Sequence, residues 1–289
     1  MNDPPIDPYS VIKDLINSGD ANGARKALAD LRGDGGDATD RESLQWLELE
    51  IDSLDQPPAA VLAKAAKLSF DDPDLRTRVG LIRARALASG DVYRPKEAIK
   101  LLRTVLAGST PDLTATVATQ LGWLLWIYRP PGEAVEFLLS HRLSNMPEPR
   151  AYLAYFLAVT RRVEAARAVF KPIRAEFSRE DPAFAAFLEC FISFKESPSP
   201  DSANALAASA EAMRAYCAPG LVEAAEALFS VKERARAVSL LEAAERIDPG
   251  YDRCQYDLAA LALSSFRFRE TLRHIRTARH WNYRRLLFT

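Results

Sequence analysis

The chain has 289 residues, of which 48% are hydrophobic and 27% charged, and its formal net charge is −1. These proportions are typical of a folded globular protein, and the charge balance gives no overall reason to expect nucleic acid or an anionic membrane as a partner. The longest apolar stretches, such as residues 121–128, are far shorter than the ~20 residues of a bilayer span, so none is expected. The opening MNDPPIDPYS has no basic region or apolar core, so no secretory signal is expected, and the three widely spaced cysteines indicate a cytoplasmic protein.

Apolar residues recur at helical spacing along the whole chain, in stripes separated by short breaks. No stretch shows the alternation of a half-buried strand, so we expect an all-α protein. In chain order, pairs of helices are expected at roughly 6–36, 40–72, 74–108, 111–145, 147–179, 181–216, 218–249 and 250–281. In the fifth pair, Pro172 is expected to kink or shorten the second helix, because proline lacks the amide that a helix interior needs.

The most regular pair lies between Pro219 and Pro249. Its first helix carries one apolar stripe and its second helix another, and small alanines alternate with leucines at the expected contact. The stripes are Leu221, Ala224, Ala225 and Leu228, then Ala237, Leu241 and Ala244. Small residues let two antiparallel helices approach closely while the leucines fill the space between them. Equivalent positions recur at intervals of about 32 to 37 residues along the chain.

This pattern resembles a tetratricopeptide repeat, a helix–turn–helix unit of about 34 residues. The resemblance covers nearly the whole chain and implies a right-handed superhelical solenoid of about eight hairpins, forming a single domain over residues 1–289. It also implies that the first helix of each pair lines one concave surface, which is where the family binds peptides and protein segments.

Aligned on Gly122, the resemblance implies groove-facing positions for five residues on the first helices: Thr119, Trp123, Trp126, Tyr155 and Phe229. Large rigid rings lose little entropy on binding, so an aromatic floor suits capture of a peptide. The alternative is that these aromatic side chains fill space between adjacent helices.

The C-terminal stretch, residues 265–289, is the one marked charge asymmetry. Seven arginines face a single acid, Glu270, giving +6 there and −7 on the rest of the chain. On a helical wheel, four basic residues fall within about 60° of one another, beside an apolar face of Phe268, Leu272 and Ile275; they are Arg269, Arg273, Arg276 and His280. This basic face is interpreted as a capping helix, as a site for an acidic protein partner, or as a site for nucleic acid or anionic lipid.

Signatures of catalysis and of metal binding are missing from the sequence. His274 and His280 are six positions apart, which places them about 120° apart around a helix, a poor arrangement for one metal ion. Cys190, Cys217 and Cys254 form no CxxC pair and are expected to be buried, reduced thiols. No cofactor or metal is therefore predicted.

The sequence favours a non-enzymatic scaffold or adaptor that binds a peptide or protein segment in its groove. Two alternatives remain open. One is a regulator that uses the arginine-rich C-terminal face to bind nucleic acid, and the other is a structural subunit of a larger assembly.

Overall fold

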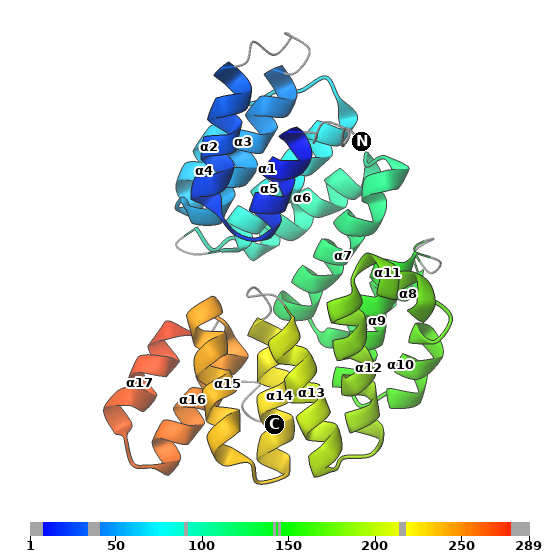
Figure 1. Ribbon diagram of the computed structural model, residues 1–289, viewed down its shortest axis with the longest axis vertical. Coiled ribbons are helices and arrows are strands. Elements are labelled where there is room, and N and C mark those ends of the chain that lie inside the picture. The colour runs from blue at the N-terminus through cyan, green and yellow to red at the C-terminus, as the bar shows by residue number, and fades with distance from the viewer. Residues whose placement is uncertain are drawn as a thin grey trace, which may run out of the picture. The chain divides into compact units, whose positions relative to one another are not determined.

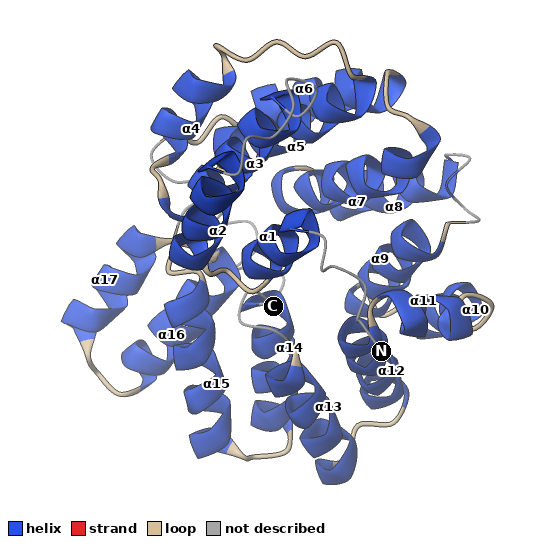
Figure 2. Cartoon of the chain, turned by 45° about the horizontal axis from the view of Figure 1, so that its top comes forward, coloured by secondary structure: helices blue, strands red, loops and turns tan. Residues whose placement is uncertain are grey.

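A computed structural model describes residues 8–33, 41–89, 92–140, 143, 146–213 and 218–278. Within these ranges the chain forms 17 helices and no strand (Figure 1, Figure 2). The predicted all-α class is confirmed. None of the described helices is both long and apolar enough to cross a membrane.

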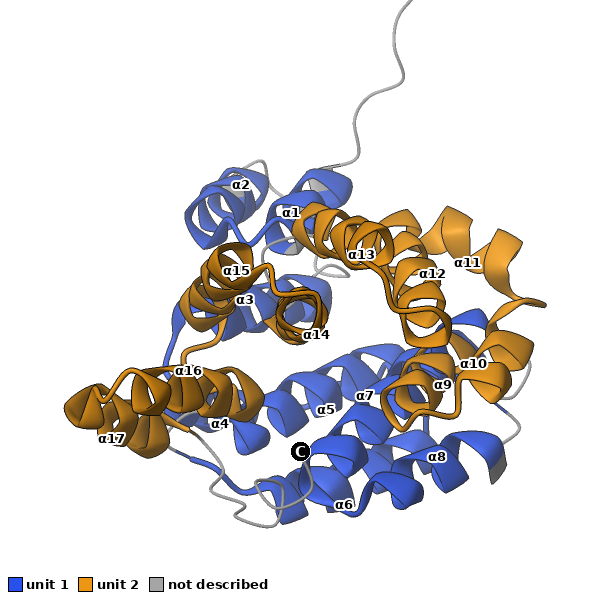
Figure 3. Ribbon diagram, turned by 90° about the horizontal axis from the view of Figure 1, so that it is seen from below, with its two compact units in different colours: residues 1–149 blue, residues 150–289 orange. Residues whose placement is uncertain are grey.

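The chain divides into two compact units, Met1–Pro149 and Arg150–Thr289 (Figure 3). The helices that lie in the first unit are α1 (Pro8–Asn17), α2 (Ala21–Gly33), α3 (Arg41–Asp55), α4 (Pro58–Ala65), α5 (Pro73–Ala88), α6 (Pro95–Ala107), α7 (Pro111–Tyr128) and α8 (Pro131–Ser140). The single domain over residues 1–289 that was expected from sequence stays a prediction.

Helix α9 (Pro147–Val159) crosses from the first unit into the second. The other helices of the second unit are α10 (Val163–Phe170), α11 (Arg174–Glu180), α12 (Pro182–Glu196), α13 (Pro200–Ala212), α14 (Ala218–Ser230), α15 (Arg234–Ile247), α16 (Asp252–Ser264) and α17 (Phe268–Thr277). The predicted effect of Pro172 is confirmed, because the second helix of the fifth pair is broken into α10 and α11 on either side of it.

Prolines set many of the helix starts. Nine of the 17 described helices begin with proline, a residue whose missing amide costs nothing in the first turn. Side chains complete some of these starts. Ser199 and Ser202 form a reciprocal capping box at α13, and the Asp181 side chain accepts a hydrogen bond from the Phe184 amide at α12. The positions of the helices therefore follow closely from local sequence.

The turns that join two helices of a pair repeat one backbone geometry. In four of them a single residue has a positive φ: Gly19, Arg161, Lys232 and Phe266. The amide of the following residue donates to the carbonyl five residues earlier, as in Asp20 to Leu15, Arg162 to Leu157, Glu233 to Leu228 and Arg267 to Ala262, at 2.8–2.9 Å. This is the Schellman closure of a helix end. Lys232 and Phe266 stand 34 positions apart, so the turns share the period of the apolar stripes.

Each helix packs mainly against its neighbours in the chain, as α14 does with α15 and α16 with α17. First helices of successive pairs also contact each other: α1 with α3, α3 with α5 and α5 with α7 in the first unit, and α12 with α14 and α14 with α16 in the second. The first helices of each unit therefore form a continuous layer.

Small side chains control how closely the paired helices approach. A β-carbon on Gly80 of α5 would lie 2.6 Å from Cγ2 of Val105 on α6, closer than real β-carbons come to other atoms. At Gly122 of α7 the nearest side-chain atoms, those of Leu138 on α8, would be 3.3 Å away. Contact between α5 and α6 thus depends on the absence of a side chain at Gly80.

We expect Gly80→Ala to lower the free energy of unfolding by about 1–2 kcal/mol, because Val105 is β-branched and has little freedom to move aside. In a Val105→Ala background the same change should be neutral or stabilising by up to about 1 kcal/mol, since alanine is the better helix former. Urea unfolding of the four proteins in a double-mutant cycle measures this. The same effect of Gly80→Ala in both backgrounds would contradict the steric explanation.

Candidate functional site

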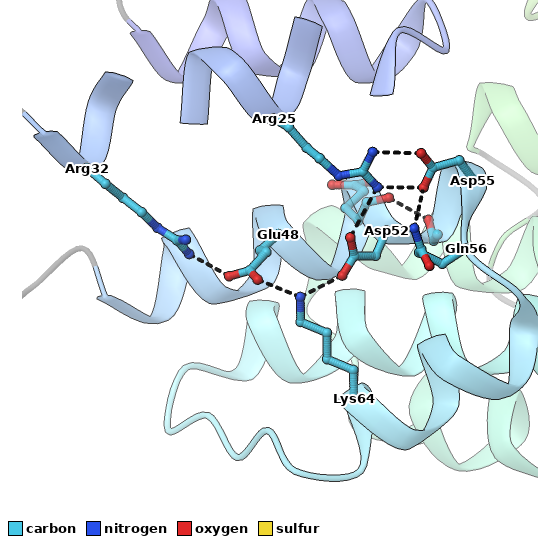
Figure 4. Close-up of polar contacts among 9 residues, drawn as sticks. Arg25, Arg32, Glu48, Asp52, Asp55, Gln56 and Lys64 are labelled. Carbon is cyan, nitrogen blue, oxygen red and sulfur yellow. Dashed lines mark hydrogen bonds and ion pairs between the residues drawn. The ribbon is translucent and has the colours of Figure 1, made fainter. Parts of the chain in front are cut away.

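A network of surface ion pairs joins three helices of the first unit (Figure 4). Arg25 of α2 makes two hydrogen bonds to Asp55 of α3, at 2.5 and 2.6 Å. Lys64 of α4 contacts Glu48 and Asp52 of α3 at 2.7 and 2.6 Å. The network connects both α2 and α4 to one row of acids on α3, since Asp52 pairs with Arg25 as well as with Lys64.

The carboxylates of this network have cations beside them. Hydrogen bonds from Lys64 and then from Arg32 lower the pKa of Glu48, and the hydrogen bond from Arg25 lowers the pKa of Asp55. Exposed pairs of this kind contribute little to stability because solvent screens them. We interpret the network as ion pairing between neighbouring helices, in which each carboxylate already has a cation beside it.

A second charged cluster lies on first helices of the second unit, with one fully buried side chain among half-buried ones. We call the side chains of Lys195 (α12), Glu223 and Glu226 (α14), and Arg253 and Asp257 (α16) the inner charged cluster. Arg253 donates hydrogen bonds to both Glu223 and Glu226, and Lys195 Nζ lies 3.9 Å from Oε2 of Glu223. The Glu223 side chain is fully buried, whereas those of Lys195 and Arg253 are about a quarter exposed.

Negative charge in the inner charged cluster is incompletely compensated. Oδ2 of Asp257 and Oε2 of Glu223 are buried without a hydrogen-bond partner among the described residues. Burial, together with the nearby Glu226, raises the pKa of Asp257 to about 7. Burial also raises the pKa of Glu226, despite the opposing effect of Arg253. This cluster therefore differs from the network of the first unit, where hydrogen bonds from cations lower the pKa values of Glu48 and Asp55.

Sequence reasoning did not find this cluster. The i,i+3 spacing of Glu223 and Glu226 on α14 is ordinary for surface acids and by itself points to no cluster. One signal was available: Glu223 interrupts an otherwise apolar run, with Val222 before it and Ala224 after it, and all three are buried. A charge within such a run needs a partner on another helix.

Three of the five predicted groove residues are buried. Trp126 is 8% exposed, Thr119 5% and Tyr155 3%. The hydroxyl of Thr119 has no hydrogen-bond partner among the described residues. Trp123 and Phe229 are half-buried, so part of each ring remains at the surface. A binding role for these residues stays a prediction, and the accessible aromatic surface is that of Trp123 and Phe229.

Tyr155 links the inner charged cluster to the aromatic core of the second unit. Its hydroxyl donates to Oε1 of Glu223 at 3.3 Å, and its ring centroid lies 5.6 Å from that of Phe191. Lys195 lies over the same Phe191 ring, with Nζ 5.0 Å from the ring centroid. The structure thus brings Tyr155 together with Glu223 of the inner charged cluster.

The predicted basic face lies on α17. Arg269, Arg273 and Arg276 are all exposed, while His280 lies outside the described residues. The apolar face of α17 does not pack inward as it would in an ordinary amphipathic helix. Phe268 and Leu272 on this face are 59% and 52% exposed.

Polar residues take the inward positions of α17. Thr271 and His274 are buried there, and Nδ1 of His274 donates to the Gln255 side-chain oxygen of α16 at 2.7 Å. Gln255 in turn donates to Glu245 of α15 at 3.1 Å. Burial lowers the pKa of His274, so the neutral imidazole is favoured. Its Nε2 is then free to accept from Arg273, which lies 3.1 Å away.

The two described cysteines differ in burial. Cys254 is buried as expected, and burial raises the pKa of its thiol to about 12, so the nucleophilic thiolate is disfavoured. Cys190 is only half-buried, and Cys217 lies outside the described residues. Among the described residues there is also no group of three or more histidine, cysteine or acidic side chains placed to hold a metal ion.

Comparison with known protein families finds none whose model matches this chain, and comparison with the curated proteins finds no match either.

Glu223 and Glu226 provide a matched test of the inner charged cluster. We expect Glu223→Gln to lower the free energy of unfolding by about 3 kcal/mol or more, because it removes a fully buried charge that pairs with Arg253. Glu226→Gln should change it by about 1 kcal/mol or less, since that side chain is part-exposed and its ionised form is already disfavoured. Guanidinium unfolding at neutral pH measures both. Equal losses would contradict the assignment of Glu223 as the central anion.

Asp257 should make stability depend on pH. Because its folded pKa, about 7, lies above the value of 3.8 for an unperturbed carboxyl, the folded state binds the proton more tightly. The stabilisation is therefore complete below about pH 4 and is lost as the pH rises through 7. Relative to wild type, Asp257→Asn should gain about 1–3 kcal/mol between pH 5 and pH 8. Urea unfolding at both values measures this gain, and the comparison cancels the titration of His274. A stability difference between Asp257→Asn and wild type that is the same at pH 5 and pH 8 would contradict the raised pKa of Asp257.

Proposed function

We propose that this chain is a non-enzymatic interaction scaffold of the tetratricopeptide-like class, whose helix pairs stack into a right-handed superhelical solenoid. The repeated Schellman turns support this fold, because one closure recurs at the same place in four of the helix pairs. Packing of each helix against its chain neighbours is the second support. We place the protein in the cytoplasm, where a buried, reduced thiol such as Cys254 is ordinary.

The proposed binding surface of each unit is the layer formed by its first helices. Polar and aromatic side chains remain part-exposed on these helices, although the surrounding positions are packed. Trp123 is such a side chain on α7 in the first unit, and Phe229, Glu226 and Arg253 are such side chains in the second. Half-exposed aromatic and arginine side chains are the types that contribute most to protein interfaces.

The observation that carries the proposal is the inner charged cluster. A layer that served packing alone would be more stable with apolar residues at these positions, since taking charges out of water is costly. The second unit instead keeps five ionisable side chains on α12, α14 and α16, with two buried carboxylate oxygens lacking hydrogen-bond partners among the described residues. Charge retained at a cost in stability is typical of a recognition site.

A capture experiment tests the proposal. Wild type is immobilised and exposed to native extract of the source organism, and retained proteins are identified and quantified by mass spectrometry. We expect a specific protein to be retained by wild type and reduced at least about fivefold, equivalent to roughly 1 kcal/mol, by Trp123→Ala or Phe229→Ala.

The matched control is Phe137→Ala, which truncates a half-buried aromatic ring on α8, a second helix. This variant should retain the partner as wild type does, and circular dichroism confirms that all three variants are folded. Equal retention by wild type and both first-helix variants would overturn the proposed surface. Loss with Phe137→Ala alone would place binding on the second helices.

A further inference from the structure

The last helix pair of the second unit exposes a cluster of large apolar side chains. Phe266 in the turn between α16 and α17 is 81% exposed, Phe268 59%, and Leu263 and Leu272 52% each. The rings of Phe266 and Phe268 contact each other edge to face, with centroids 6.4 Å apart. Apolar side chains that gather on a surface in this way mark an interaction site.

Phe266 also occupies a backbone conformation that favours glycine. Its φ is +56°, in the same turn position as Gly19, Arg161 and Lys232. A bulky residue is uncommon in this region, and glycine would be accommodated without steric cost. Phe266 therefore contributes neither an easy turn nor buried surface to the fold. A strained, exposed aromatic residue is better explained by a contact that it makes outside this unit.

A stripe of positive charge runs beside the apolar cluster. Arg269, Arg273 and Arg276 are exposed on α17 and lie within about 60° of one another around the helix, next to Phe268 and Leu272. In the described part of the chain, no acidic side chain forms an ion pair with any of these three arginines, whereas the neighbouring Arg267 pairs with Glu270 at 2.7 Å. The two stripes follow the helix axis side by side.

We propose that this outer face of α17, together with the preceding turn, docks an acidic amphipathic helix of a partner protein. A helix laid along α17 would place its apolar stripe on Phe266, Phe268 and Leu272 and its acids opposite Arg269 and Arg276. The proposal rests on the proposed scaffold function but concerns a surface separate from the first-helix layer.

Charge and side-chain type favour this occupant over the others. In a symmetric pairing of two copies, the same arginine stripe would be present on both sides of the interface. Residues 279–289 carry three further arginines and no acid, so their charge has the same sign as the face. Nucleic acid would match the arginines but makes no use of aliphatic side chains such as Leu263 and Leu272, on which bases do not stack.

The test uses a fluorescein-labelled helical peptide of about 18 residues with leucines at i, i+3, i+4 and i+7 and glutamates flanking them. A second peptide has lysine in place of every glutamate, and a single-stranded DNA oligonucleotide is the third probe. Fluorescence anisotropy with the full chain should show the acidic peptide binding at least about tenfold more tightly than the lysine peptide. Its affinity should fall several-fold between about 50 and 300 mM salt, because the arginines are exposed.

Phe266→Gly separates binding from folding. It should weaken the acidic peptide at least about fivefold while raising the thermal unfolding midpoint, since glycine suits the positive φ. Lys232→Gly makes the same change in the preceding pair and should raise the midpoint without affecting binding. Arg269→Glu should weaken the peptide about tenfold, with Arg83→Glu, an exposed arginine of α5, as the matched control without effect.

Several outcomes would overturn the proposal. One is no binding of the acidic peptide at about 1 mM, and another is tighter binding of the oligonucleotide, which would assign the face to nucleic acid. A dimer in sedimentation equilibrium that Leu272→Ser dissociates would assign it to a second copy, and binding that appears only after deletion of residues 279–289 would assign it to that segment. If Trp123→Ala loses the captured partner while the α17 variants behave as wild type with the peptide, this inference fails and the proposed function stands.

Discussion

Close approach of the two helices within each pair is the constraint on which the rest of this structure depends. A single helix with one apolar stripe cannot cover that stripe by itself, so each helix needs its neighbour. Gly80 and Gly122 leave the space that Val105 and Leu138 occupy, and small alanines such as Ala225 and Ala237 are fully buried in the α14–α15 pair. The turns with positive φ bring the second helix back along the first at this short distance.

Once the pairs are closed, charge distinguishes the two units. In the first, hydrogen bonds from cations on α2 and α4 lower the pKa values of Glu48 and Asp55 on α3. In the second, Arg253 and Lys195 are the cations beside Glu223, Glu226 and Asp257, and the Glu223 side chain is fully buried. A carboxyl group that takes up a proton near neutral pH is the result. Acidic and basic side chains on neighbouring helices therefore form compensated ion pairs in one unit and an incompletely compensated charged site in the other.

Most of the helix pattern was predictable from sequence because its causes are local. Prolines at helix starts, the break at Pro172 and the period of the apolar stripes all act within a few residues. The burial of Trp126 and Tyr155 was harder to predict, since helical periodicity shows which side of a helix is apolar and not which parts of it the next pair covers. The partner of Glu223 lies 30 residues away on α16, and no local rule connects the two.

Helix α17 shows what a polar contact does that an apolar one does not. Apolar packing tolerates small rotations of a helix about its own axis, and a rotation of α17 would bring Phe268 and Leu272 against α16. Hydrogen bonds are directional. The bond from His274 to Gln255, with Gln255 itself held by Glu245 and the Pro249 carbonyl, defines one angular setting of the helix. These hydrogen bonds thus fix the rotation of α17 about its own axis. They keep its apolar stripe exposed, although burial of that stripe would be favourable.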